Sequence, residues 1–178
     1  LALDLMLELE RLEQLPQHYF ILELSADLRQ RQQQRIEREA AHLSGRFEWL
    51  ETLPQKFTGL VLGNEVLDAM PVELITWRPG AISERGVALQ DGRFVWAERA
   101  LTRSGLLEQA RALPPAQFVS GEAAYTSEIN LAAQGFMRSL GQMLERGLIL
   151  MLDYGFGQSE YYHPQRRQGT LMCHYRHH

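Results

Sequence analysis

The sequence predicts an α/β domain: a parallel sheet with helices on both faces, interrupted by an antiparallel insertion. Short apolar runs of strand length alternate with amphipathic helical segments before Pro71, which is the pattern of βαβ units. A tight-turn signal between two further strands predicts a hairpin in the middle of the chain. Of the 178 residues, 45% are hydrophobic, so one domain can bury a sizeable core without disulfides.

The part before Pro71 is predicted to run helix, strand, helix, strand, strand. Leucines recur at helical spacing over residues 1–12, and the apolar run His18 to Leu24 predicts a strand buried on both faces. Ser25 is predicted to cap a helix from Ala26 to about Leu43. Two more predicted strands follow, residues 46–50 and 57–62.

The middle of the chain is predicted to form an inserted antiparallel β and helical subdomain, residues 72–126, between parts 1–71 and 127–178. Asp91-Gly92 is a good type I′ turn and joins two of its strands. The predicted elements are strands at 72–77, 81–90 and 93–97 and a helix at 104–113.

The last part begins with a strong apolar stripe from Ile129 to Leu144, which predicts a helix, followed by a buried strand from Leu148 to Asp153. The following Asp-Tyr-Gly-Phe-Gly resembles the glycine-rich loop of a nucleotide-binding fold. No long helical pattern follows and the third glycine is absent, so we expect a loop that covers the site rather than a cofactor cradle.

Composition excludes several classes of protein. With 18 Lys+Arg against 22 Asp+Glu, the net charge of −4 argues against a nucleic-acid partner, which needs clustered cations. The single cysteine, Cys173, rules out an intrachain disulfide and fits the cytoplasm. The longest apolar run, Leu148 to Leu152, is too short to span a bilayer, so no membrane partner is expected.

Several polar residues come where the predicted parallel strands end, the edge at which such sheets bind ligands. These are Glu23, Trp49, Asn64, Glu65 and Asp153. A carboxylate such as Glu23 can accept two hydrogen bonds from a ribose diol. The alternative is a solvated strand-end carboxylate or an ion pair with Arg29.

The segment from Gly63 to Pro71 carries the second candidate. Gly63 permits close backbone approach, Asn64 is predicted to cap a helix, and Glu65 and Asp68 would share one face of its first turn. Paired carboxylates suit a guanidinium, or a proton held between them. The alternative is capping and dipole compensation without any function.

Metal binding is not expected. Cys173, His174, His177 and His178 have ligand chemistry, but their spacing is poor for one ion. The arginines of the Gln-rich helix after Ser25 are interspersed with acids, which predicts a solvated face.

Five stretches together carry a family resemblance: YFILELSADLRQRQ, FEWLETLP, GLVLGNEVLDAMPVE, EINLAAQGF and LILMLDYGFGQSEYYHPQRRQGTL. The chain resembles the MidA-type family of class I S-adenosylmethionine-dependent methyltransferases, whose mitochondrial members support respiratory complex I assembly by methylating a protein arginine. The resemblance implies a Rossmann-like sheet with a substrate-facing insertion.

By the same resemblance, Glu23 would bind the ribose of S-adenosylmethionine, Trp49 would lie near the adenine, and Asn64 near the methyl donor. Glu65 and Asp68 would be catalytic and face an arginine of a protein substrate. A homodimer is left open, and the compartment would be the bacterial cytoplasm or the mitochondrial matrix.

Family members carry a glycine-rich loop ahead of the first helix and further strands after Gly169-Thr170. We therefore expect a chain truncated at both ends, without the first strand and that loop, which binds cofactor weakly or not at all. Two alternatives are kept: a non-catalytic assembly module on the same fold, and methylation of a nucleic-acid base amine, which the acidic balance disfavours.

Overall fold

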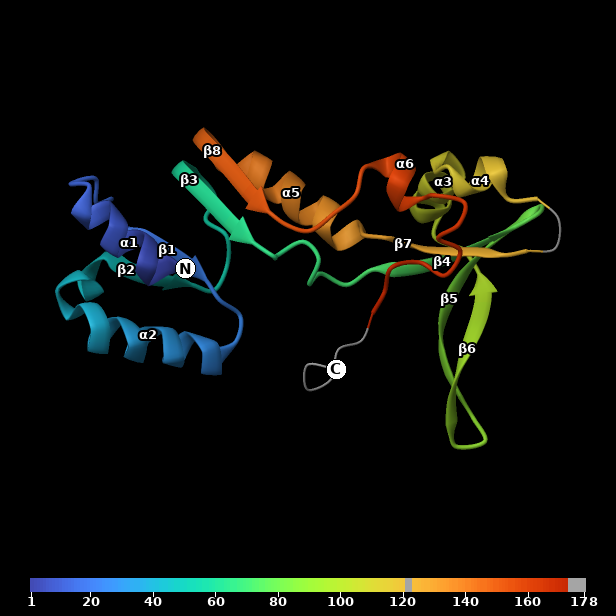
Figure 1. The fold of residues 1–178 in the computed structure, drawn as a ribbon, viewed down its shortest axis with the longest axis horizontal. Helices are drawn as coiled ribbons and strands as arrows, with labels where there is room; N and C mark the ends of the chain where they lie inside the picture. The colour runs from blue at the N-terminus through green and yellow to red at the C-terminus, as the bar shows by residue number, and fades with distance from the viewer. Residues whose placement is uncertain (121–122, 173–178) are drawn as a thin grey trace. The chain divides into compact units, whose positions relative to one another are not determined.

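The computed structural model describes residues 1–120 and 123–172 (Figure 1). They divide into two compact units, Leu1–Phe57 and Thr58–His178, and each is described by itself. Within the described residues, no helix is both long enough and apolar enough to cross a membrane.

The first unit is a βαβ unit preceded by a helix. Its strands β1 (Tyr19–Leu22) and β2 (Phe47–Leu50) are parallel, with Tyr19 opposite Phe47 and Leu22 opposite Leu50. Its helical elements are α1 (Ala2–Arg11), α2 (Ala26–Ala40) and the 3₁₀ helix η1 (Ala41–Arg46). The parallel pairing predicted for this part is confirmed.

Local sequence accounts for the two helices. The Ser25 hydroxyl accepts a hydrogen bond from the Leu28 N–H at 3.3 Å, which confirms the predicted cap of α2. The helix ends at Ala40, before the predicted Leu43, because the chain tightens into η1. Both helices place apolar residues in one core, which consists of Leu3, Met6, Ile36, Ala40, Leu43 and Phe47.

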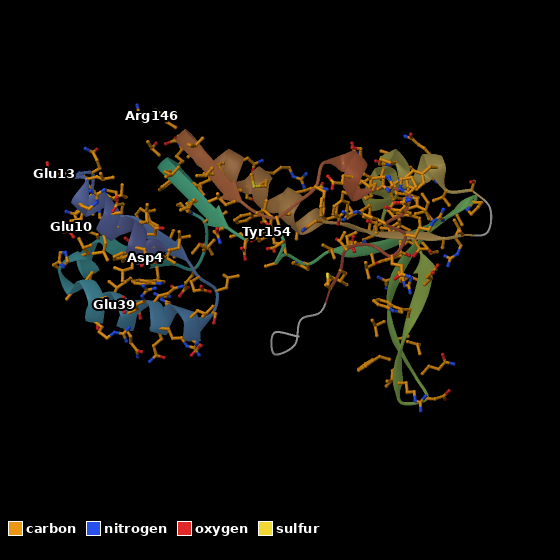
Figure 2. The ribbon with its side chains drawn as sticks, in the orientation of Figure 1. Asp4, Glu10, Glu13, Glu39, Arg146 and Tyr154 are labelled. Carbon is orange, nitrogen blue, oxygen red and sulfur yellow. The ribbon has the colours of Figure 1, made fainter. Side chains whose placement is uncertain are left out.

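The arginines of α2 lie on an ion-paired, solvated face, as predicted. Arg31 pairs with Asp27, and Arg35 pairs with Asp4 and Glu39, which are both labelled in Figure 2. The other face of β1 is less enclosed than expected: Phe20 remains 38% exposed, where the apolar run predicted burial on both faces.

Strand β3 (Phe57–Asn64), which belongs to the second unit except for its first residue, pairs with β8 (Leu144–Leu152), and their arrows run in the same direction in Figure 1. Helix α5 (Leu131–Met143) leads into β8. The predicted buried strand therefore exists, but Leu148 is 59% exposed among the described residues. The predicted start of α5 at Ile129 is wrong, because that residue ends a strand.

A four-stranded antiparallel sheet in the order β6-β5-β4-β7 forms the rest of this unit. Its strands are β4 (Glu73–Arg78), β5 (Ala81–Gln90), β6 (Arg93–Ala100) and β7 (Tyr125–Ile129). The predicted type I′ turn is confirmed by φ values of 50° at Asp91 and 73° at Gly92. Strand β7 was not predicted, and it extends the sheet to Ile129.

Helix α3 (Ser104–Ala112) and the short α4 (Pro115–Phe118) pack on one face of this sheet. The indole N–H of Trp77 donates to the carbonyl of Ala110 at 2.9 Å, so the one polar atom of the largest core side chain has a hydrogen-bond partner. The architecture is thus a mixed α/β fold. A single Rossmann-like sheet that joins β1, β2, β3 and β8 stays a prediction.

Candidate functional site

Glu23 directly follows β1 and lies in a defined hydrogen-bonding environment. Its Oε1 accepts the Ser25 N–H at 2.9 Å, and its Oε2 accepts the side-chain amide of Gln32 at 3.1 Å. Arg29, the predicted alternative partner, instead lies 3.8 Å from Glu51. The Glu23 carboxylate is therefore neither freely solvated nor held by that arginine.

Trp49, in β2, is connected to the same amide. Its indole N–H donates to the Gln32 Oε1 at 2.9 Å. Gln32 therefore links the two residues predicted to contact the cofactor into one chain, Glu23–Gln32–Trp49. Sequence reasoning did not single out Gln32, because α2 has four glutamines and none differs from the others by pattern.

The chemistry of this group fits a ribose diol. An ionised carboxylate offers about four lone-pair positions, and the two hydrogen bonds found on Glu23 leave acceptor capacity on both oxygens. The side chain is only partly buried, so that capacity can be reached from solvent. A fixed carboxylate with a free edge is the arrangement that two adjacent hydroxyl groups require.

In the second unit, the segment after β3 is not the predicted helix. Asn64 is the last residue of the strand and does not act as an N-cap, and the backbone of Glu65 has a φ of 51°. This left-handed conformation redirects the chain, and a turn from Leu67 to Met70 follows. Glu65 and Asp68 are exposed, but they do not share a helical face.

This acidic loop, residues 65–70, is fixed by the ends of other elements. Asp153 Oδ2 accepts the N–H groups of Leu67 at 2.8 Å and Asp68 at 3.3 Å. The Glu65 N–H donates to the Leu152 carbonyl at 2.8 Å. Asp153, singled out from the sequence as a strand-end residue, therefore positions the loop backbone.

Asn130 and Gly63 complete the support. The Asn130 Oδ1 caps α5 by accepting the Ala133 N–H at 2.8 Å, while its amide donates to the Leu67 carbonyl at 3.1 Å. A Cβ on the buried Gly63 would overlap the side-chain sulfur of Met151, so a larger residue here would displace that side chain, and the close backbone approach stays a prediction. The acidic loop is thus anchored from both β8 and α5.

Beyond β8, the predicted covering loop is anchored through a buried carboxylate that the sequence did not reveal. Glu128, in β7, is 4% exposed, and its oxygens accept the N–H groups of Thr170 and Leu171 at 2.7 and 2.9 Å and the Tyr161 hydroxyl at 2.9 Å. Burial raises the pKa of Tyr161 to about 12.

The loop itself starts at Tyr154, which is 82% exposed (Figure 2). A short helix, α6 (Gln158–Tyr161), begins directly after Gly157, where the sequence predicted none. No cluster that could hold a metal ion occurs among residues 1–120 and 123–172. Cys173, His174, His177 and His178 lie outside the described residues.

The structure brings Glu23 and Trp49 together through Gln32 in the first unit, and gathers Asn64, Glu65 and Asp68 on one anchored segment of the second. The first arrangement could hold a vicinal diol. The second presents two exposed carboxylates on a fixed backbone, which could hold a cationic group.

Comparison with known proteins assigns this arrangement to a family. The family described as "Putative S-adenosyl-L-methionine-dependent methyltransferase" matches residues 1–178. A search of curated proteins found no match.

Two solved structures from Burkholderia thailandensis are similar. An uncharacterized COG1565 superfamily protein is 42% identical with a TM-score of 0.90, over 99% of this chain and 46% of that one. A second COG1565 superfamily member, bound to S-adenosyl-homocysteine, is 44% identical with a TM-score of 0.88, over 99% of this chain and 44% of that one. This chain spans less than half the length of either protein. By its sequence match and its fold, the chain belongs to this family of S-adenosyl-L-methionine-dependent methyltransferases.

Proposed function

We propose that the full-length protein that contains this chain transfers a methyl group from S-adenosylmethionine to an arginine side chain of a protein substrate. The observation that carries the proposal is the chain Glu23–Gln32–Trp49, which gives both predicted cofactor residues a fixed position. A relative 44% identical to this chain was solved with S-adenosyl-homocysteine, the product left when that cofactor has given up its methyl group.

In this proposal the first unit binds the nucleoside part of the cofactor. Glu23 would accept hydrogen bonds from the ribose hydroxyls through the lone pairs that Ser25 and Gln32 leave free. Trp49 would lie near the adenine, with its ring held by the bond to Gln32. Asn64 would lie near the methyl donor, at the end of β3.

The cofactor would supply an electrophilic methyl group on a sulfonium sulfur. A guanidinium nitrogen would form the new N–CH₃ bond as the S–CH₃ bond breaks, and its proton would leave to a carboxylate or to water. Such a transfer depends mainly on positioning. The transfer itself requires no metal ion.

Glu65 and Asp68 would orient the guanidinium and take up that proton. Their carboxylates are exposed, and the backbone that carries them is anchored by Asp153 and Asn130. Two carboxylates on a fixed segment match the planar fork of donors that a guanidinium presents. The acidic loop is therefore the proposed substrate-recognition element.

Glu65→Gln and Asp68→Asn variants of the full-length protein test the proposal. We expect each to slow transfer of a radiolabelled methyl group to arginine-containing protein by about 10²-fold or more, the usual size of a general-base contribution. Binding of S-adenosyl-homocysteine should be unchanged. Glu108→Gln, an exposed acid on α3, is the matched control. Undiminished transfer in both variants would refute the role of these acids.

A further inference from the structure

The β5–β6 hairpin continues beyond the rest of its sheet (Figure 1). β4 pairs with β5 only over Ala81–Arg85, whereas β5 pairs with β6 as far as Gln90 and Arg93. The outer part of the hairpin is thus a two-stranded arm among the described residues. Such an arm is marginally stable in water unless one face is covered.

One face of this arm is apolar and exposed. The register places Val87 opposite Trp96 and Leu89 opposite Phe94, and directly opposed residues share a face. Their exposures are 61%, 55%, 69% and 83%, in that order. The other face carries smaller side chains, such as Ala88 and Ala97.

Charged residues lie at both ends of this apolar patch. Along β5, Arg85, Val87 and Leu89 alternate with residues of the other face and so lie on one side, with Glu98 of β6 directly opposite Arg85. The Arg85 guanidinium lies 4.7 Å from the centre of the Trp96 ring, at the inner end of the patch. Asp91 lies at the outer end, in the exposed turn.

We propose that two copies of this protein associate by stacking these apolar faces, with the arms antiparallel about a two-fold axis. In that arrangement Val87 of one copy faces Leu89 of the other, and the aromatic residues face each other likewise. Arg85 of each copy then meets the partner's Asp91. This arrangement would therefore bring a cation and an anion together at each end of the stacked arms.

The exposed area of the apolar patch is consistent with its being covered by a second copy of the protein. Aromatic side chains bury ~150–250 Å² each, so the four exposed side chains offer roughly 500 Å² per copy. Two copies would bury about 1,000 Å², the lower end of specific interfaces. A patch of this size is also at the upper end of what monomers normally expose.

The test is the mass of the full-length protein, measured by sedimentation and light scattering across a wide concentration range. We expect a concentration-dependent dimer, and we expect Phe94→Ser or Trp96→Ser to weaken it about tenfold or more, because buried aromatic anchors dominate interfaces. Ala97→Ser, on the opposite face of the same strand, is the matched control. Circular dichroism establishes that each variant is folded.

A charge exchange tests the orientation. Asp91→Arg should weaken the dimer by placing two cations together, and adding Arg85→Asp to the same chain should restore it. A protein that stays monomeric throughout the concentration range would overturn the proposal. A dimer whose dissociation constant is unchanged by Phe94→Ser and Trp96→Ser would overturn it too. The patch would then be covered by another part of the full-length chain or by a different protein.

Discussion

The amide of Gln32 is the residue-scale feature on which the proposed cofactor site depends. It donates to Glu23 and accepts from Trp49, so it fixes a carboxylate that directly follows β1 and an indole in β2. A hydrogen bond to a charged group contributes about 1.5–3 kcal/mol, more than a neutral one. Gln32 should therefore affect binding without touching the cofactor.

We predict that Gln32→Ala weakens binding of S-adenosyl-homocysteine to the full-length protein by about tenfold, and that Gln32→Glu weakens it further because two carboxylates would then face each other. Isothermal titration calorimetry measures the affinity. Gln34→Ala, an exposed position on the same helix, should bind like the wild type. Equal affinity in all three variants would show that Gln32 does not position Glu23.

At this scale the sequence could indicate residue types but not their environments. Glu23 and Asp153 were found because strand ends are predictable from apolar runs. The helix expected after Asn64 fails because Glu65 adopts a left-handed backbone and Asp153 accepts two N–H groups from the loop. The two hydrogen bonds to Asp153 join residues more than 80 positions apart, which local sequence patterns cannot predict.

At the scale of elements, Glu128 holds the segment from α6 to Leu171 onto β7. Five hydrogen bonds reach its carboxylate, from two backbone N–H groups and three hydroxyls. Gly169, which directly precedes Thr170, has a left-handed backbone with a φ of 77°. A Cβ there would overlap the Glu128 carboxylate.

Gly169→Ala should therefore lower the free energy of unfolding by about 1–3 kcal/mol, because it combines a left-handed backbone with a steric overlap. Denaturant unfolding measures the loss. Gly141→Ala is the control, since this exposed position in α5 has open space and should gain about 0.5–1 kcal/mol. A Gly169→Ala variant as stable as the wild type would show that the segment does not pack as described.

Alkaline pH should release the same segment. Burial raises the pKa of Tyr161 from its usual value near 10 to about 12, so the folded state holds that proton more tightly than the unfolded state. The resulting stabilisation is complete below pH 10 and is lost as the pH rises through about 12.

Tyrosinate absorbance and near-ultraviolet circular dichroism, followed together during an alkaline titration, should detect this loss. We expect Tyr161→Phe to reduce the pH dependence of stability between about pH 10 and 12, whereas Tyr154→Phe, at an exposed position, leaves it intact. A titration of Tyr161 at its ordinary pKa would contradict the buried arrangement.

The elements themselves were predicted well where their signals are local. The hairpin follows from Asp91-Gly92, and α2 from Ser25 and its helix formers. Strand β7 was missed because Ile129 continues the apolar rhythm of α5. Three polar residues of β7, Thr126, Ser127 and Glu128, are buried. They become so only when β4 and the segment from α6 to Leu171 pack around the strand.

At the scale of the whole molecule, the mixed α/β architecture and the family membership agree with what the motifs indicated. The single Rossmann-like sheet stays a prediction, because no short-range pattern fixes which strands pair with one another. The proposed reaction needs a bound cofactor before any substrate can be methylated. Cofactor binding is thus the central claim.

The most direct test is calorimetric titration of S-adenosyl-homocysteine into the full-length protein, beside its Glu23→Ala and Glu48→Ala variants. Glu48 is an exposed acid on β2 and serves as the control. We predict binding that Glu23→Ala weakens by roughly 10- to 150-fold, the value of a charge-accepted hydrogen bond, and that Glu48→Ala leaves unchanged. Absence of binding in the folded protein would contradict the account and favour a non-catalytic assembly module. Equal affinity in all three proteins would contradict the role of Glu23.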